Sequence, residues 1–412
     1  MRTLVVGSGG REHALALALS RDPSVTEVHA APGNPGTARV ATLHDVDPLD
    51  GTAVARLARE LGVALVVVGP EAPLVAGVAD AVRDAGISCF GPSREAAAIE
   101  GSKSFAKDVM AAAGVPTAMA HVCTTEQEAA DALDAFGPPY VVKDDGLAAG
   151  KGVVVTEDRA EALAHAVTCG RVVIEEFLDG PEVSLLAITD GRTVVPMLPA
   201  QDYKRVLDGG VGVNTGGMGA YTPLPWVPEG LVAEVTDRVL QPTVDEMARR
   251  GTPFAGLLYA GLALTGRGTR VVEFNARFGD PETQPLLALL ESPLGVVLKA
   301  AADGCLDEVA PLRWRPGVAV AVVVASANYP GTPRTGDPIE GIDDAEALEE
   351  VEVIHAGTAL GDDGRLVTAG GRVLAVTATG STLAQARERA YAGVARISID
   401  GAHHRTDIAA GG

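Results

Sequence analysis

Lysine, aromatic residues and cysteine are all scarce in this chain of 412 residues. Its 33 basic residues include only six lysines, aromatic residues make up 4%, and the four cysteines are scattered without a close pair. Scattered cysteines are typical of reduced thiols, so we expect a cytoplasmic protein without a disulfide framework. No uninterrupted apolar run is long enough to span a bilayer, so the membrane is not an expected partner. The short apolar start is interpreted as a first β-strand, because glycines follow it at once.

Positive charge is also in short supply. The formal net charge is −21, and such a chain repels nucleic acid and anionic membranes, so neither is an expected partner. Phosphate groups would have to be bound by local features such as glycine loops, helix N-termini, metal ions and a few placed cations. Five of the six lysines lie between positions 103 and 204, which makes that segment the first candidate for such a site.

The patterning predicts a multidomain protein with α/β and α+β parts. Residues 1–101 alternate short apolar runs with helical patterns, which predicts an N-terminal doubly wound α/β domain. Residues 102–312 form a central region, in which about 117–190 are expected to be a small α+β lid, and residues 313–412 form a small C-terminal α/β domain. Single helices are expected over 74–85 and over 229–250, and Pro242 should bend or split the second one.

The segment Val-Val-Glu-Phe-Asn-Ala-Arg-Phe-Gly-Asp-Pro-Glu-Thr-Gln (271–284) carries the densest chemistry. Residues two apart in a strand share a face, so Glu273 and Asn275 project together. One carboxylate and one amide oxygen suit Mg²⁺, which usually leaves its other positions to water and phosphate. The alternative is a strand that ends in a polar loop. Arg277 and Asp280, together with a glycine-lysine loop upstream, favour the metal site.

That upstream loop, residues 143–153, joins two expected strands and contains three glycines and two lysines. Glycine lets backbone N–H groups approach phosphate oxygens, and Lys143 and Lys151 would supply charge. The loop is not a Walker A motif, because its glycine spacing is too short and Gly152 stands where Ser or Thr should bind Mg²⁺. An ordinary glycine hairpin is the alternative, but it rarely carries so many lysines. We therefore favour phosphate binding that includes Gly150, Lys151 and Gly152.

The apolar strand expected near 171–178 ends in two acids, an aromatic residue and a leucine. Such an end can present backbone groups and a carboxylate to an adenine edge, and Glu182 can reach a ribose hydroxyl. A core strand with a polar end explains the spacing equally well. The candidate residues at this strand end are Glu175, Glu176, Phe177 and Leu178.

Residues 201–221 bracket a loop that is long for a compact domain, and such loops are often functional. Asp202 can hold an ammonium group, and Gly216 and Gly217 can admit a small ligand. A flexible surface loop is the alternative, and the spacing of these residues does not exclude it.

Glycines that follow the first expected strand and open a helix form a second candidate phosphate site, at Gly9, Gly10 and Arg11. The third glycine of the dinucleotide fingerprint is missing, and the second strand lacks the acid that would hold an NAD ribose. The phosphate of a small substrate is therefore favoured over NAD. His13 is expected to be a capping or core residue.

Seven motifs, taken in order, resemble the phosphoribosylamine–glycine ligase family, the glycinamide ribonucleotide synthetases of purine biosynthesis, which are ATP-grasp enzymes. The resemblance covers essentially the whole chain and includes His-Ala-Gly-Thr (355–358) near its end. The seven motifs are Gly-Ser-Gly-Gly-Arg-Glu-His (7–13), Ala-Pro-Gly-Asn (31–34), Gly-Pro-Glu-Ala-Pro-Leu-Val (69–75), Glu-Gly-Ser-Lys (100–103), Asp-Gly-Leu-Ala-Ala-Gly-Lys-Gly-Val (145–153), Asn-Thr-Gly-Gly-Met-Gly-Ala-Tyr (214–221) and Arg-Phe-Gly-Asp-Pro-Glu-Thr-Gln (277–284).

The resemblance implies an ATP-dependent carboxylate–amine ligase that couples glycine to 5-phosphoribosylamine through glycyl phosphate. It implies ATP-grasp central domains with a mobile lid, and a monomer. Glu273 and Asn275 would hold Mg²⁺, or Mn²⁺, on the triphosphate, while Lys103, Lys143 and the 146–152 loop would clamp its oxygens. Residues 175–178, with Glu182, would line the adenine and ribose site.

The resemblance also implies roles at the substrates. Asp202 and the Gly216–Gly217 backbone would hold glycine, and Arg277 would face its carboxylate or the transferring phosphoryl group. The helix start at Gly9, Gly10 and Arg11 would take the ribose 5-phosphate. Asn34 and Glu71 lie in matching motifs and join the expected substrate-binding residues. The expected catalytic residues are Arg277, Asp202 and Lys143.

Three features depart from the family pattern: Asp144 replaces alanine, Val213 replaces proline, and the segment between 167 and 171 is short. An extra acid near the triphosphate is unfavourable unless strand alternation points Asp144 away from the face of Lys143, and we expect the departures to affect the lid rather than the reaction class. The alternatives to this ligase are an ATP-grasp ligase for another amino acid or amine, an NAD-dependent oxidoreductase, and a non-catalytic nucleotide-binding scaffold.

Overall fold

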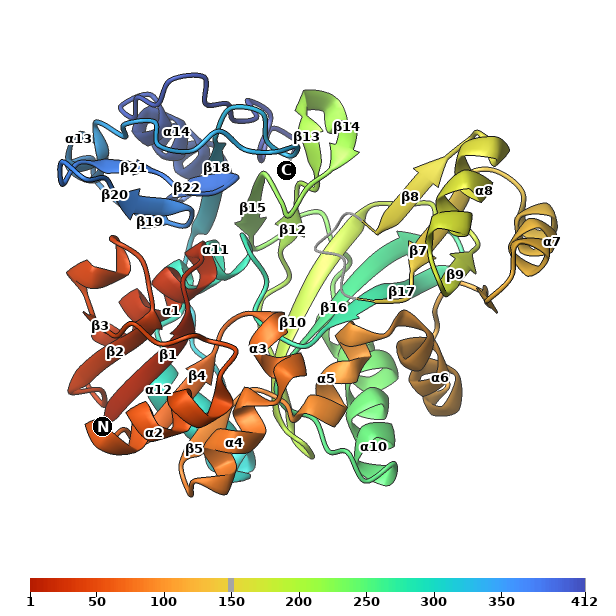
Figure 1. The fold of residues 1–412 in the computed structure, drawn as a ribbon, viewed down its shortest axis with the longest axis horizontal. Coiled ribbons are helices and arrows are strands. Elements are labelled where there is room, and N and C mark those ends of the chain that lie inside the picture. Colours follow the sequence, from red (N-terminus) through yellow and green to blue (C-terminus); the bar gives the residue numbers. More distant parts are fainter. Residues whose placement is uncertain (147–151, 412) are drawn as a thin grey trace.

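The computed structural model describes residues 1–146 and 152–411 (Figure 1). The predicted Gly150 and Lys151 lie outside the described residues. Within those two ranges, no helix is both long and apolar enough to cross a membrane. The fold is mixed α/β, with one parallel sheet and several antiparallel sheets, as the patterning predicts.

The N-terminal unit is a parallel sheet in the order β3-β2-β1-β4-β5, flanked by helices. Its elements are β1 (Arg2–Gly7), α1 (Gly10–Ser20), β2 (Glu27–Pro32), a 3₁₀ turn (Thr37–Arg39), β3 (Thr42–Leu43), α2 (Gly51–Leu61), β4 (Leu65–Val68), α3 (Glu71–Ala76), α4 (Val78–Asp84) and β5 (Ser88–Phe90). The single helix expected over 74–85 is wrong. Gly77 adopts a φ of +88°, a left-handed conformation that ends α3 and starts α4 in a new direction.

The lid is a four-stranded antiparallel sheet in the order β6-β9-β7-β8, covered by two helices. Its elements are β6 (Ala120–Cys123), α7 (Glu126–Phe136), β7 (Tyr140–Asp144), β8 (Val153–Thr156), α8 (Arg159–Thr168) and β9 (Val172–Glu175). Helix α7 begins with a capping box, in which Thr125 and Glu128 satisfy each other's backbone N–H groups. In Figure 1 the lid stands apart from the N-terminal unit, on the other side of the central sheet.

The central sheet has the order β11-β10-β16-β17, and its last strand carries Glu273 and Asn275. The elements around it are α5 (Arg94–Gly101), α6 (Lys103–Ala113), β10 (Glu182–Asp190), β11 (Val194–Pro196), α9 (Leu231–Val235), α10 (Gln241–Arg249), β16 (Ala255–Thr265), β17 (Gly268–Asn275), α11 (Thr283–Leu289), α12 (Leu294–Asp303) and a 3₁₀ turn (Leu306–Glu308). The helix expected over 229–250 is split, as Pro242 predicts: a π-helical turn at Thr236–Leu240 separates α9 from α10.

A fourth sheet, in the order β12-β15-β18-β22-β19, joins strands from both sides of residue 313. The elements of this region are β12 (Gln201–Asp202), β13 (Arg205–Leu207), a 3₁₀ turn (Asp208–Gly210), β14 (Val211–Asn214), β15 (Gly219–Thr222), β18 (Val318–Ala325), α13 (Ile342–Glu346), β19 (Val351–His355), β20 (Thr358–Leu360), β21 (Leu366–Thr368), β22 (Arg372–Gly380) and α14 (Leu383–Val394). Because β15 pairs with β18, the loop of residues 201–221 is attached to the C-terminal unit.

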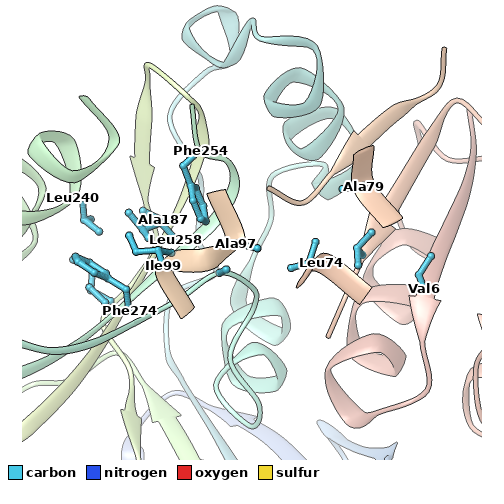
Figure 2. Close-up of a cluster of buried hydrophobic side chains, with 14 of the residues drawn as sticks. Val6, Leu74, Ala79, Ala97, Ile99, Ala187, Leu240, Phe254, Leu258 and Phe274 are labelled. Carbon is cyan, nitrogen blue, oxygen red and sulfur yellow. The ribbon is translucent and has the colours of Figure 1, made fainter. Parts of the chain in front are cut away.

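The apolar core fixes the N-terminal sheet relative to the central sheet (Figure 2). In the picture, α5 carries Ala97 and Ile99 between Leu74 on one side and Phe274 and Leu258 on the other. Ile99 and Leu258 are at most 1% exposed, and burial of such a side chain stabilises a fold by about 1.5–3 kcal/mol. The N-terminal unit is therefore held firmly beside β17 and the polar residues that β17 presents.

Candidate active site

One cleft of about 870 Å³ brings most of the predicted site residues together. The lid, α6, β17, the β13–β14 hairpin and the C-terminal unit all contribute to its walls. Gly9, Gly10, Asn34 and Gly217 lie outside the lining. The predicted residues that line the cleft are Arg11, Glu71, Lys103, Lys143, Gly152, Glu175, Glu176, Phe177, Leu178, Glu182, Asp202, Gly216, Glu273, Asn275 and Arg277.

Lysines form the wall of the cleft beside the lid. Nζ of Lys143 lies 2.8 Å from one oxygen of Glu175, and Nζ of Lys107 lies 3.0 Å from the other. Nζ of Lys103 donates to the carbonyls of Asp144 at 2.7 Å and Gly146 at 2.8 Å. Burial lowers the pKa of both Lys103 and Lys107. Lys107 and Lys143 thus share one buried carboxylate and Lys103 binds two carbonyls, so this wall presents positive charge that suits an anion.

Lys107 was missed by the sequence analysis, although a signal was present. Lys103 and Lys107 are four residues apart on α6 and therefore share a helix face. Asp145 fixes this helix start to the glycine loop, because it accepts hydrogen bonds from Ser104 N at 3.0 Å and Ser104 Oγ at 2.6 Å. Lys103 is thus held at the entrance of the loop, and Lys107 lies one turn further along α6 beside Glu175.

The end of β9 does not present all its carboxylates to a ligand. Glu175 is 3% exposed and is engaged by two lysines, and Glu176 pairs with Arg267 at 2.8 Å and accepts from Met119 N at 3.1 Å. Phe177 is 44% exposed, so an aromatic face is available in the cleft. Glu182 pairs with Lys204 at 2.8 Å. The Glu176 N–H donates to the Met119 carbonyl at 3.0 Å, so Phe177 and the backbone after Glu176 are the remaining recognition elements of this strand end.

The oxygen pair on β17 lies at the centre of the cleft. One oxygen of Glu273 is 3.5 Å from Nζ of Lys204. Burial opposes ionisation of Glu273, but Lys204, Lys143 and Arg277 outweigh it and lower the pKa of this carboxyl. A charged carboxylate beside an amide oxygen suits a hard divalent cation. Within the described ranges, no group of three or more His, Cys, Asp or Glu residues could hold a metal. Those residues therefore do not form a metal site made of protein side chains alone.

Arginines form a second wall, where the N-terminal unit meets β17. Arg277 Nε lies 3.2 Å from Glu71, and its Nη2 lies 3.0 Å from Glu100. Glu100 also accepts from Ala276 N at 2.7 Å, so it fixes both the backbone and the side chain at this point. Burial opposes the charge of Arg277, but Glu100 and Glu71 outweigh it and raise its pKa. Glu100 was missed as a site residue, although it opens one of the seven motifs.

The predicted phosphate site at the start of α1 is occupied by protein carboxylates. Gly9 N donates to Glu12 at 2.6 Å, and Arg11 N donates to Asp280 at 3.4 Å. The Asn34 amide donates to the carbonyls of Ser8 at 2.8 Å and His355 at 2.9 Å, which joins the N- and C-terminal units. The binding of a ribose phosphate there stays a prediction. His13 is a core residue, as expected, and accepts from His355 N at 2.8 Å.

Asp202 is a partly buried acid whose buried Oδ1 has no hydrogen-bond partner among the residues that the structure describes. Burial, followed by the negative charge of Glu282, raises the pKa of Asp202 well above its usual value. Glu282 itself accepts from Ser184 at 3.1 Å. Buried polar atoms in proteins nearly always have partners, so an unsatisfied acid oxygen in a cleft indicates a place for a donor, such as an ammonium group.

The Asp144 departure has a structural explanation. The Asp144 carbonyl accepts a hydrogen bond from Lys103. Burial, followed by the nearby Asp144 carboxylate, raises the pKa of the Cys169 thiol at the end of α8. The Asp144 carboxylate therefore lies beside Cys169, and the Lys143 ammonium lies beside Glu175.

An antiparallel lid and an antiparallel central sheet that enclose a cation-lined cleft define the class: this is an ATP-grasp protein. Three family models match the chain in order: the N domain of phosphoribosylglycinamide synthetase over residues 1–100, its ATP-grasp (A) domain over 101–283 and its C domain over 319–411. The chain belongs to the phosphoribosylglycinamide synthetase family.

Individual relatives agree with this assignment along the whole chain. The chain is 67% identical to phosphoribosylamine–glycine ligase of Streptomyces coelicolor over 100% of its own length and 99% of the relative. It is 58% identical to the Mycobacterium tuberculosis protein of the same name, over 99% of its length and 97% of that protein. The crystal structure of phosphoribosylamine–glycine ligase from Thermotoga maritima superposes with a TM-score of 0.85 at 34% identity, covering 99% of this chain and 100% of that one.

Proposed function

We propose that this chain joins glycine to 5-phosphoribosylamine with ATP, releasing glycinamide ribonucleotide, ADP and phosphate. One observation carries the proposal: a single cleft holds a lysine wall, a carboxylate–amide oxygen pair and an acid with an unpartnered buried oxygen. These are the groups needed to align a triphosphate, a metal ion and an amino acid in one place. The name shared by relatives that match the whole chain supports the same reaction.

ATP would lie along the lid. Lys103, Lys143 and the loop of residues 146–152 would hold the phosphates, and backbone groups of 176–178 would meet the adenine edge. Glu273 and Asn275 would hold Mg²⁺; Mn²⁺ also accepts hard oxygen ligands. A bound divalent cation would neutralise charge on the phosphate oxygens. The lysine wall contributes to the same end, because Lys107 and Lys143 share one carboxylate and Lys103 binds only carbonyls.

Glycine would bind at the Asp202 and Arg277 side of the cleft. Its ammonium group would donate to Asp202 beside Gly216 and Gly217, and Arg277 would face its carboxylate. The γ-phosphoryl group passes from ATP to a carboxylate oxygen, ADP leaves, and glycyl phosphate remains. The amine of phosphoribosylamine then attacks the acyl carbon, a C–N bond forms, and phosphate leaves as the amine loses a proton. No side-chain nucleophile is required.

The N-terminal unit, residues 1–101, would supply the phosphoribosylamine site. Arg11 and Glu71 reach the cleft from this unit, and the start of α1 with Asn34 lies behind them. Residues 102–312 would carry ATP and residues 313–412 would complete the cleft. We further propose that the chain acts as a monomer, which sedimentation equilibrium would test.

A substrate-omission assay tests the reaction. Purified protein is incubated with ATP and Mg²⁺, and ADP is measured with glycine, with phosphoribosylamine, with both and with neither. We expect sustained ADP release only with both substrates. Equal turnover with another amino acid would replace the proposal by a different ATP-grasp ligase, and ATP binding without turnover under any condition would leave a nucleotide-binding scaffold. The complete reaction is then repeated after chelation, with Mg²⁺ or Mn²⁺ restored. This tests whether turnover requires a divalent cation and which of the two restores it.

A further inference from the structure

Arg372, at the start of β22 in the C-terminal unit, lines the cleft and contacts the loop that contains Gly216 and Gly217. Its Nη1 donates to the carbonyl of Gly216 at 2.5 Å and to the carbonyl of Asp280 at 2.6 Å. Its Nη2 lies 3.4 Å from the Asp280 carboxylate. One guanidinium therefore joins the loop that follows β14 to the segment that follows β17.

The C-terminal unit holds the Gly216 residue at both of its backbone polar groups. Gly216 N donates to the Tyr329 hydroxyl at 3.1 Å, and its carbonyl is held by Arg372. A Cβ on Gly216 would come within 3.0 Å of the Arg372 guanidinium carbon, so the loop backbone lies directly against this side chain. The position of the loop is thus set by residues that lie more than a hundred positions away.

This loop determines the surroundings of Asp202. Gly217 has a φ of +111°, and a Cβ there would lie 2.6 Å from the unpartnered Oδ1 of Asp202 and 2.4 Å from Pro281. The loop backbone is therefore packed against the acid on one side and the residue after Asp280 on the other. A shift of about an ångström in the loop would change the space beside Asp202, and misplacement on that scale is enough to slow a reaction substantially.

We propose that Arg372 is a positioning residue, which holds the Gly216–Gly217 backbone and Asp280 in the arrangement that the amino-acid pocket at Asp202 requires. The part of this proposal that concerns glycine rests on the proposed function. A guanidinium is suited to the task, because its planar fork carries several donors in fixed directions. A lysine ammonium is a point charge and does not hold two carbonyls and a carboxylate in the same geometry.

Arg372→Gln and Arg372→Lys test the proposal, and Arg389→Gln is the matched control. Arg389 lies in the same unit, is 22% exposed like Arg372, and binds one backbone carbonyl and one carboxylate, but it does not line the cleft. We expect Arg372→Gln to raise the KM for glycine by ~10-fold or more, as loss of a charge-assisted hydrogen bond predicts. The affinity for a non-hydrolysable ATP analogue should stay within about twofold, and Arg372→Lys should rescue only part of the loss.

Hydrogen exchange separates this proposal from the proposed function. Backbone amides of residues 214–219 should exchange faster in Arg372→Gln than in the unmodified protein, and the Arg389→Gln control should leave them unchanged. That readout holds whatever the substrates are, whereas failure of glycine-dependent turnover in the unmodified protein would overturn the ligase assignment alone. Unchanged exchange in this loop, or a glycine KM in Arg372→Gln equal to that of Arg389→Gln, would overturn the positioning role.

Discussion

The two walls of the cleft use different cations for different purposes. On the lid side, Lys107 and Lys143 share a single buried carboxylate, Glu175, and Lys103 binds only backbone carbonyls. On the side of the N-terminal unit, Arg277 pairs with two carboxylates, Glu71 and Glu100. In the first wall, three ammonium groups therefore have one carboxylate partner between them, whereas in the second, one guanidinium contacts two.

The difference follows from the chemistry of the two side chains. A lysine ammonium is compact and can reorient its donors toward a phosphate, whereas an arginine fork holds planar groups in a fixed relation. In a chain with 33 basic residues and only six lysines, three lysines on one wall mark the place where mobile positive charge is needed. The arginine wall instead joins separate parts of the fold, because its partners come from α3 and α5.

The largest expected effect is that of Arg277→Lys, which keeps the charge and removes the fork. Glu71 and Glu100 cannot both be satisfied in the original geometry by one ammonium group. We expect kcat/KM for the complete reaction to fall by ~100-fold or more, with ATP analogue affinity little changed. Steady-state kinetics and calorimetric titration measure the two quantities. A loss below about threefold would mean that charge alone matters on this wall as well.

The sequence predicts the oxygen pair at the centre of the cleft better than it predicts the residues that hold the walls in place. Strand alternation places Glu273 and Asn275 in the cleft correctly, because that rule needs only the local sequence. Arg372 could not be found in this way, since it reaches the site through the pairing of β15 with β18, whose partners are about a hundred residues apart. The break at Gly77 was missed because helical periodicity continues across it, although glycine is a common helix end.

A smaller effect is expected at Lys103, where substitution by arginine should be tolerated. Lys103→Ala removes a cation from the phosphate wall and should weaken binding of an ATP analogue by ~10-fold. Lys103→Arg keeps the charge, and Lys103 is only partly buried, so affinity should stay within about threefold of the unmodified protein. Titration calorimetry checks both variants. If the arginine variant binds as weakly as the alanine variant, the lysine wall depends on geometry and the contrast between the walls disappears.

A separate effect, away from the cleft, concerns stability at the contact between His13 of the N-terminal unit and His355 of the C-terminal unit. Burial, followed by the charges of His355 and Arg39, lowers the pKa of His13 to about 3, and burial with Arg39 lowers the pKa of His355 to about 4. Both histidines are neutral in the folded state, and the unfolded chain takes up protons as the pH falls below about 6.5. Their stabilising contribution is therefore complete above that pH and is lost progressively toward pH 4.

Each histidine should lower the free energy of unfolding by ~2 kcal/mol between pH 7 and pH 5. Urea unfolding at the two pH values measures this loss, and His13→Gln should reduce the difference between them. Substitution of the exposed His121 serves as the control. If His13→Gln leaves the pH dependence of the unfolding free energy unchanged, protonation of these two histidines does not control the stability of this contact.

The most direct test of the division between the walls compares Lys103→Ala with Arg277→Lys in one experiment. Both variants are titrated with a non-hydrolysable ATP analogue and Mg²⁺, and both are assayed for the glycine dependence of ADP release with phosphoribosylamine present. We predict opposite patterns: Lys103→Ala loses ATP affinity while the glycine KM changes little, and Arg277→Lys retains ATP affinity while glycine-dependent turnover collapses. Equal losses of ATP affinity in the two variants, or equal losses of glycine-dependent turnover, would contradict a cleft divided between a phosphate wall and an amino-acid wall.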